Sequence, residues 1–179
     1  LPEPLPPINV ARYRPQISAA PDPEAVKEAT NRMKQAKNPV MLAGRASRSL
    51  DAWNARVAIA EAVGAKVITD MKIGASFPTD HPLHVGTPGM LLPDADGLAA
   101  LAAADVILAF DWVDLGGSLK AAKTEAFVIS ATLDHHIHNG WSMDHQAFAP
   151  VDMLISADPD AVALALAKEM GPPAKPVAL

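Results

Sequence analysis

Short and almost uninterrupted apolar runs recur along this chain, and helical patterns separate most of them. The runs are Pro39–Ala43, Lys66–Thr69, Asp105–Phe110, Phe127–Ala131 and Val151–Ile155. An apolar run without polar alternation indicates a strand that is buried on both faces of a sheet. Such strands are parallel, because helical crossovers cover both faces of a parallel sheet. The sequence therefore predicts an α/β domain with a mainly parallel sheet of five or six strands.

Capping signals and helical spacing place helices between these runs. Asp22 followed by Pro23 predicts the start of the first helix, and Ser49 predicts the start of the second, which puts Trp53, Val57 and Ala60 on one face. Asp158 followed by Pro159 is the strongest helix start in the chain. The helices are expected over Pro23–Lys37, Ser49–Gly64, Asp94–Ala104, Leu115–Ala122 and Pro159–Met170.

Helices on both faces of a parallel sheet make a doubly wound, Rossmann-like fold. Ligands of such folds bind beyond the carboxyl ends of the strands, where the strand order reverses. Four loops are expected at that edge of the sheet: Gly44–Ser49, Asp70–Ser76, Asp111–Gly117 and Thr132–Asn139.

The amino-acid composition limits the kinds of molecule that the chain is expected to bind. Half of the 179 residues are hydrophobic, the formal net charge is -5, and basic residues form no run. This balance argues against nucleic acid or a membrane as a partner and favours a small molecule or a protein. The chain has no cysteine, which excludes disulfides and thiolate metal sites and fits a cytoplasmic protein. It also has no bilayer-spanning apolar run and no signal-peptide pattern.

Proline is concentrated at the two ends of the sequence. Proline fixes φ and lacks a backbone donor, so both ends are expected to be extended. We interpret residues 1–22 as an interdomain linker, residues 23–171 as the central domain and residues 172–179 as the start of a second linker. This organisation predicts that the sequence is a middle piece of a longer polypeptide.

One family shares several of these segments in the same order. The segment Lys66–Gly86, KVITDMKIGASFPTDHPLHVG, contains the pattern KxxGxxFPxDHPLxxG directly after a predicted strand. It resembles the central domain of thiamine diphosphate-dependent enzymes of the acetolactate synthase and benzoylformate decarboxylase superfamily. The segments AxxPVMLAGRAS, AADVILAF and FVISATLD are similar to further strands of that domain. The resemblance extends from about Val26 to Met170.

The resemblance implies a three-domain parent enzyme that decarboxylates a 2-oxo acid and releases or transfers the acyl unit. In this family thiamine diphosphate and magnesium are held by the flanking pyrimidine- and diphosphate-binding domains, across the interface of a homo-oligomer. The Gly-Asp-Gly motif of the diphosphate-binding domain does not occur in this sequence. We therefore expect no catalytic and no metal-binding residue here, and the role of the domain to be structural.

The family's central domain can also bind FAD or ADP, which makes the strand ends a candidate nucleotide cleft. Its residues here are Gly44, Arg45, Asp70, Met71, Asp111, Thr132 and Asp134. A glycine turn lets backbone approach a pyrophosphate, and Arg45 could pair with phosphate. Thr132, however, stands where the family has the acid that holds the ribose, and Asp111 stands where glycine is frequent. A vestigial, empty cleft is favoured, and an independent adenine-nucleotide binding module is the alternative.

The histidines have two interpretations. Asp134, Asp144 and the neighbouring histidines could bind a transition metal, but their spacing matches no established ligand set, so a polar loop is favoured; the histidines are His135, His136, His138 and His145. His81 and His84 lie in the FPTDHPLHVG segment, where hydrogen bonding within a proline-constrained loop is favoured over catalysis.

Overall fold

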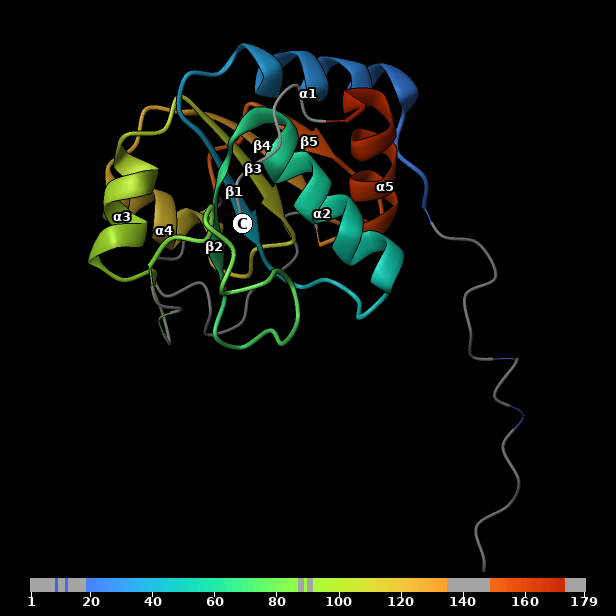
Figure 1. The fold of residues 1–179 in the computed structure, drawn as a ribbon, viewed down its shortest axis with the longest axis horizontal. Helices are drawn as coiled ribbons and strands as arrows, with labels where there is room; N and C mark the ends of the chain where they lie inside the picture. The colour runs from blue at the N-terminus through green and yellow to red at the C-terminus, as the bar shows by residue number, and fades with distance from the viewer. Residues whose placement is uncertain are drawn as a thin grey trace, which may run out of the picture.

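Parallel strands form the centre of the domain, as the apolar runs predict. The computed structural model describes residues 19–86, 92–134 and 149–172, together with residues 9, 12 and 89. The strands are β1 (Pro39–Ala43), β2 (Lys66–Thr69), β3 (Val106–Phe110), β4 (Phe127–Ala131) and β5 (Met153–Ile155). They make a five-stranded sheet in the order β2-β1-β3-β4-β5, and every neighbouring pair is parallel. Figure 1 shows this sheet between its helices.

The helices that the structure describes begin directly after a capping residue, and three of these caps, Asp22, Ser49 and Asp158, are the predicted ones. They are α1 (Pro23–Gln35), α2 (Leu50–Val63), α3 (Ala95–Ala102), α4 (Leu115–Ala122) and α5 (Pro159–Met170). Each is preceded by an Asp or Ser whose side chain accepts a backbone N–H of the first turn: Asp22, Ser49, Asp94, Asp114 and Asp158. These caps fix the start of every helix that the structure describes.

Several predicted ends were one or two residues too long; β3, for example, starts at Val106 instead of Asp105. Helix α1 stops two residues before Lys37, because the backbone N–H groups of Lys37 and Asn38 turn away to donate to the Asp105 carboxylate, at 2.6 and 3.0 Å. Helix α3 ends at Ala102 instead of Ala104. Strand β5 starts at Met153 instead of Val151, because the Asp152 side chain accepts the Val128 N–H, at 2.8 Å, before the ladder begins.

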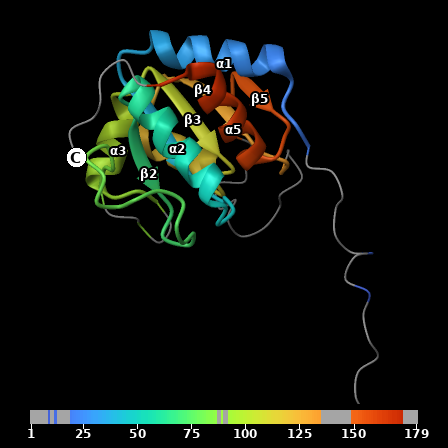
Figure 2. The ribbon, with the colours of Figure 1, turned by 45° about the vertical axis from the view of Figure 1, so that its right-hand side comes forward.

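The helices divide into two layers, one on each face of the sheet (Figures 1 and 2). Helices α1, α2 and α5 cover one face, where their apolar residues pack on Met41, Val67, Leu108, Phe110 and Ile129. Helices α3 and α4 cover the other face, where Leu101, Leu115 and Leu119 pack on Val40, Leu42, Ile68, Ile107 and Val128. Alternate residues of each strand thus enter different cores, which is the doubly wound arrangement that the sequence predicts.

The buried face of α2 differs from the prediction. Ala60 is buried, but Trp53 and Val57 are only half-buried. The buried side chains are instead Ala52, Ala55, Arg56, Ile59 and Ala60. Because α2 packs beside α5 as well as on the sheet, its buried face is rotated toward that neighbour (Figure 2). An arginine therefore lies in the core-facing stripe.

The edge strand β2 is covered by the FPTDHPLHVG segment. The Val67 N–H donates to the Leu83 carbonyl and the Val85 N–H donates to the Val67 carbonyl, both at 2.8 Å. Residues 83–85 thus run parallel to β2 and bond its outer edge. Phe77 and His81 of the same segment are buried and pack edge to face, 5.2 Å between ring centroids. The family-like segment is therefore part of the sheet's architecture.

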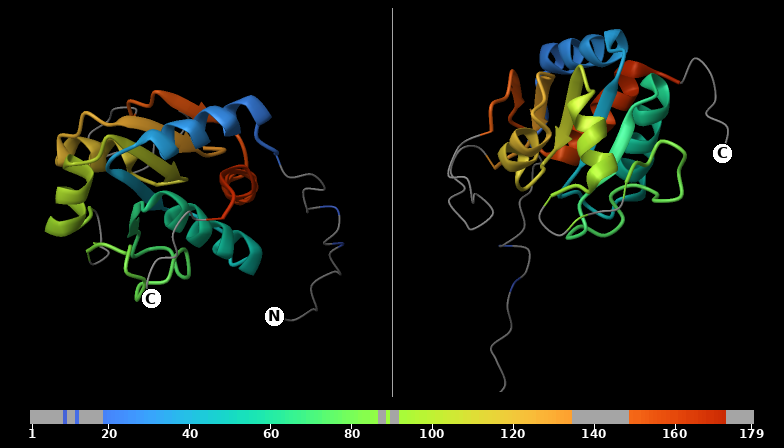
Figure 3. Two further views of the ribbon diagram at one scale, coloured as in Figure 1. Left: turned by 45° about the horizontal axis from the view of Figure 1, so that its top comes forward. Right: turned by 90° about the vertical axis from the view of Figure 1, so that its left-hand side faces the viewer.

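Strand β1 lies between β2 and β3, so the chain passes from β1 to β2 on one side and returns to β3 on the other. The carboxyl ends of β1 and β3 form the switch point of the sheet, where a doubly wound fold places its ligand. Figure 3 shows further views of the strands and of the loops that follow them. None of the helices described is long and apolar enough to cross a membrane.

Candidate ligand-binding cleft

Five of the seven predicted cleft residues meet at the switch point. The Arg45 guanidinium donates to the Asp111 carboxylate at 2.9 Å and to the Asp134 carboxylate. The Thr132 hydroxyl donates to the same Asp111 oxygen at 2.5 Å and accepts the Asp134 N–H at 2.9 Å. The loops after β1, β3 and β4 are thereby joined in one network, which we call the switch-point network: Arg45, Asp111, Thr132 and Asp134.

Gly44, the fifth residue, lets two loops approach each other closely. Its N–H donates to the Phe110 carbonyl and the Arg45 N–H donates to the Asp111 carbonyl, both at 3.0 Å. A Cβ added at Gly44 would lie 2.5 Å from the Asp111 oxygen and 2.6 Å from the Phe110 oxygen. The neighbouring backbone therefore fills the space that a pyrophosphate would need beside this glycine.

Asp111 has a backbone conformation that explains why glycine suits this position. Its φ is 45°, in the left-handed region that side chains other than those of Asn and Asp rarely adopt. In this conformation the Asp111 carboxylate accepts from both Arg45 and Thr132. Thr132, where the resemblance implies a ribose-binding acid, donates its hydroxyl hydrogen to the protein itself.

The charge of this network disfavours phosphate. Burial alone would lower the pKa of Arg45, but its hydrogen bonds to Asp111 and Asp134 and their charges outweigh burial and raise that pKa. The single cation is thus shared between two carboxylates, and the network carries an excess negative charge. A phosphate arriving here would have to compete with both carboxylates for Arg45.

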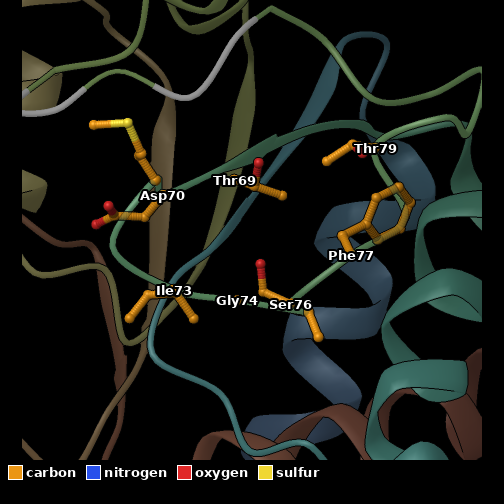
Figure 4. Close-up of a pocket in the computed structure, with 9 residues that line it drawn as sticks. Thr69, Asp70, Ile73, Gly74, Ser76, Phe77 and Thr79 are labelled. Atoms are coloured by element: carbon orange, nitrogen blue, oxygen red, sulfur yellow. The ribbon is translucent and has the colours of Figure 1, made fainter.

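The other two predicted cleft residues belong to a separate cavity. Asp70 and Met71 line a pocket of about 380 Å³ formed by the loop after β2 (Figure 4). Its wall also includes Ile73, Ser76 and Phe77. The buried Asp70 carboxylate accepts from the Lys72 ammonium at 2.9 Å and from the Lys72 N–H at 2.9 Å. The predicted cleft is thus two adjacent sites along one edge of the sheet.

One residue that sequence reasoning missed is Arg56 on α2. Its side chain is 1% exposed and donates to the Ser76 carbonyl at 2.7 Å and to the Asp160 carboxylate at 2.8 Å. Asp160 in turn accepts the Ser47 N–H at 3.2 Å. Burial lowers the pKa of Arg56, and Asp160 offsets this only in part. In the sequence, Arg56 could have been noticed as a positively charged residue on an otherwise apolar helix face, four residues from both Ala52 and Ala60.

The histidines of the covering segment make structural hydrogen bonds, as predicted. His81 accepts the Leu83 N–H through Nδ1 at 3.2 Å, and its Nε2 lies 3.4 Å from the Glu61 carboxylate. His84 Nε2 lies 3.0 Å from the Thr69 hydroxyl. Asp114 accepts the Gly117 N–H at 3.1 Å and is the cap of α4.

The predicted polar histidine loop lies outside the described residues, apart from Asp134. Among the residues that the structure places, no group of three His, Cys, Asp or Glu side chains could hold a metal ion. The metal-binding alternative for residues 135–145 therefore remains a sequence hypothesis.

Comparison with known proteins identifies a matching family model and similar curated proteins. The family model described as "Thiamine pyrophosphate enzyme, central domain" matches residues 26–166. The acetolactate synthase large subunit of Corynebacterium glutamicum is 30% identical over 133 residues, which are 72% of this chain and 21% of that protein. The acetolactate synthase of Mycobacterium avium matches with the same identity and coverage. The chain thus spans about a fifth of the length of these curated relatives.

Solved structures share the fold. A candidate thiamin diphosphate-dependent enzyme from Mycobacterium smegmatis superposes with a TM-score of 0.61 at 24% identity, over 92% of this chain and 31% of that one. Benzoylformate decarboxylase from Polynucleobacter necessarius superposes with a TM-score of 0.59 at 20% identity, over 95% of this chain and 31% of that one. Both superpositions extend over nearly the whole of this chain, which contains the sheet and its two helical layers.

Proposed function

Because this chain belongs to the family of thiamine pyrophosphate enzyme central domains, we propose that it serves as the central, non-catalytic domain of a thiamine diphosphate-dependent decarboxylase or carboligase of the acetolactate synthase type. The observation that carries the proposal is the extent of the family match. It runs from α1 to α5 and so includes the whole sheet and both helical layers. The parent enzyme would release or transfer the acyl unit of a 2-oxo acid.

The cofactor chemistry is assigned to other domains of the parent. Magnesium in cofactor sites is held by one or two carboxylates together with phosphate oxygens of the bound group. At the switch point Asp111 and Asp134 are both paired with Arg45, so these carboxylates do not fit a thiamine diphosphate and magnesium site. The flanking pyrimidine- and diphosphate-binding domains, in a homo-oligomer, would supply it, in keeping with relatives in which this chain corresponds to 21% of the length.

An occupied FAD or ADP cleft is the less favoured reading. Backbone fills the space beside Gly44, and Arg45 is already paired with two carboxylates. A pyrophosphate gains most from free N–H groups and an unshared cation, and the switch-point network offers neither. We therefore propose that the domain's role is structural, with a vestigial nucleotide cleft.

Calorimetry of the 179-residue chain with FAD, ADP and NAD tests this role. No heat above dilution is expected for any of them, and micromolar binding would establish the independent nucleotide-binding module instead. The parent polypeptide gives the second test. It should release CO₂ from a 2-oxo acid only with thiamine diphosphate and a divalent cation, whereas the 179-residue chain alone should not. A parent that is indifferent to thiamine diphosphate would refute the proposed class.

A further inference from the structure

The cavity of the β2 loop has the size and walls of a small-molecule site. Its volume of about 380 Å³ is at the lower end of the range typical of ligand pockets. Ile73 and Phe77 give it apolar walls, and Thr69, Asp70 and Ser76 contribute polar groups (Figure 4). The pocket is built by one continuous loop and does not include the switch-point network.

One wall of the pocket contains a hydroxyl without a partner. Ser76 is 2% exposed, and its Oγ has no hydrogen-bond partner among the described residues. Figure 4 shows Ser76 beside Gly74 with its oxygen directed toward the space inside the loop. Buried polar groups are bonded in the great majority of cases, so the unpaired Ser76 hydroxyl in the pocket wall points to an absent partner.

The charges around the pocket favour an anion of low charge. Asp70 is neutralised by Lys72, and Arg56 is balanced by Asp160. Arg48 is exposed, makes no ion pair with any residue that the structure places, and its Nη2 lies 4.0 Å from the Cβ position of Gly74 in the pocket wall. One uncompensated cation therefore remains at the rim. A single cation balances one negative charge, so an anion of low charge suits this rim better than a multiply charged phosphate.

We propose that this pocket binds a small aliphatic monocarboxylate. Its alkyl part packs against Ile73 and Phe77, where it is removed from water. Its carboxylate accepts from the Ser76 hydroxyl, which a rotation about the Cα–Cβ bond turns to the ligand, and faces the Arg48 guanidinium. This inference concerns a different cavity from the nucleotide cleft and does not rest on the proposed function of the parent.

Titration of the ¹⁵N-labelled 179-residue chain tests the inference by NMR. The probes are isobutyrate, its neutral amide isobutyramide, inorganic phosphate and ADP. Isobutyrate should shift the backbone amides of residues 70–79 and saturate at concentrations on the order of millimolar, as expected for a ligand of a few heavy atoms. Isobutyramide should bind at least about fivefold more weakly, because it lacks the charge.

Two variants and one control variant test whether isobutyrate binds at Ser76 and Arg48. Ser76→Ala should weaken isobutyrate binding by about fivefold, the effect of one hydrogen bond. Arg48→Gln should weaken it and remove its dependence on salt. Lys27→Gln removes an exposed cation on α1 and should change nothing. Since Arg48 is exposed, its variant remains informative if Ser76→Ala does not fold.

Three results would overturn the proposal. They are an absence of shifts in residues 70–79, equal binding of isobutyrate and isobutyramide, and stronger shifts of the same amides by phosphate or ADP. The last would make the pocket a nucleotide site, and calorimetry with the nucleotides would then give heat from this pocket.

Discussion

Arg56 of α2 and Asp160 of α5 form an ion pair at 2.8 Å, and the same arginine holds the Ser76 carbonyl of the β2 loop. The pair connects two helices of one layer with the loop that builds the pocket. Its arginine is almost completely excluded from water, whereas its aspartate remains 19% exposed. The stability of the β2 loop is therefore coupled to the packing of α5.

Replacement of Arg56 should destabilise the domain strongly. Arg56→Met leaves Asp160 without its partner and the Ser76 carbonyl without its donor, which should lower the free energy of unfolding by about 3 kcal/mol. Urea unfolding measures the change, with Arg48→Met as the exposed control, expected within about 0.5 kcal/mol of the original chain. A loss below about 1 kcal/mol for Arg56→Met would mean that the ion pair contributes little.

Gly44 should not tolerate even a methyl group. A Cβ at this position would overlap two backbone carbonyl oxygens, which cannot move without breaking the β1–β3 ladder. Gly44→Ala should therefore cost about 2 kcal/mol or more in thermal or urea unfolding. Gly74→Ala is the matched control, because its nearest neighbour is a side-chain atom 4.0 Å away. Equal stability of the two variants would contradict the close approach at Gly44.

Thr132 should contribute to folding rather than to ligand binding. Thr132→Val keeps the shape but removes the donor to Asp111 and the acceptor of the Asp134 N–H. We expect a loss of about 1 to 2 kcal/mol in the free energy of unfolding. Thr79→Val, at an exposed position, should be close to neutral. A stability unchanged in Thr132→Val would leave the switch-point network without a structural role.

His84 should make the domain less stable at mildly acidic pH. Burial lowers the pKa of His84 below its ordinary value of 6.5, and the charge of Asp94 opposes this only in part. A lowered pKa means that the folded protein binds the proton less readily than the unfolded chain. The stabilising contribution is thus complete well above pH 6.5 and is lost as the pH falls from 6.5 toward the folded-state pKa.

The comparison of unfolding free energies at pH 7.5 and pH 5.5 measures this contribution. His84→Gln should lose less stability than the original chain over this interval, and the His84 ring signals in an NMR titration should report the lowered pKa directly. A ring pKa above 6.5 in the folded protein would reverse the sign of the effect.

The sequence predicts the framework of this domain well because the signals are local. Five apolar runs mark the strands, and an Asp or Ser cap marks the start of each helix. Strand β2 and helix α4 have the predicted bounds, whereas the end of α1 depends on Asp105, which is 68 residues from Lys37 in the chain. Local patterns do not contain such a contact.

The candidate site also depends on contacts between residues that are distant in the sequence. The residues at the carboxyl edge of the sheet follow from the fold class, but their pairing does not. From the sequence, Arg45 could pair with a phosphate, yet Asp111 and Asp134, which are 66 and 89 residues away in the chain, already accept its hydrogen bonds. Arg56 was overlooked because a long side chain can reach from a buried helix face to a distant carboxylate. Only the three-dimensional structure brings such partners together.

The hydrogen bonds between β2 and residues 83–85 also bear on aggregation. An exposed edge strand is a template to which another chain can add its own strand. Here the outer carbonyl and N–H of Val67 are already used by Leu83 and Val85. Substitutions that detach residues 83–85 would therefore expose the edge of β2 while most of the domain remains folded. Self-association through this edge, rather than unfolding, would be their first consequence.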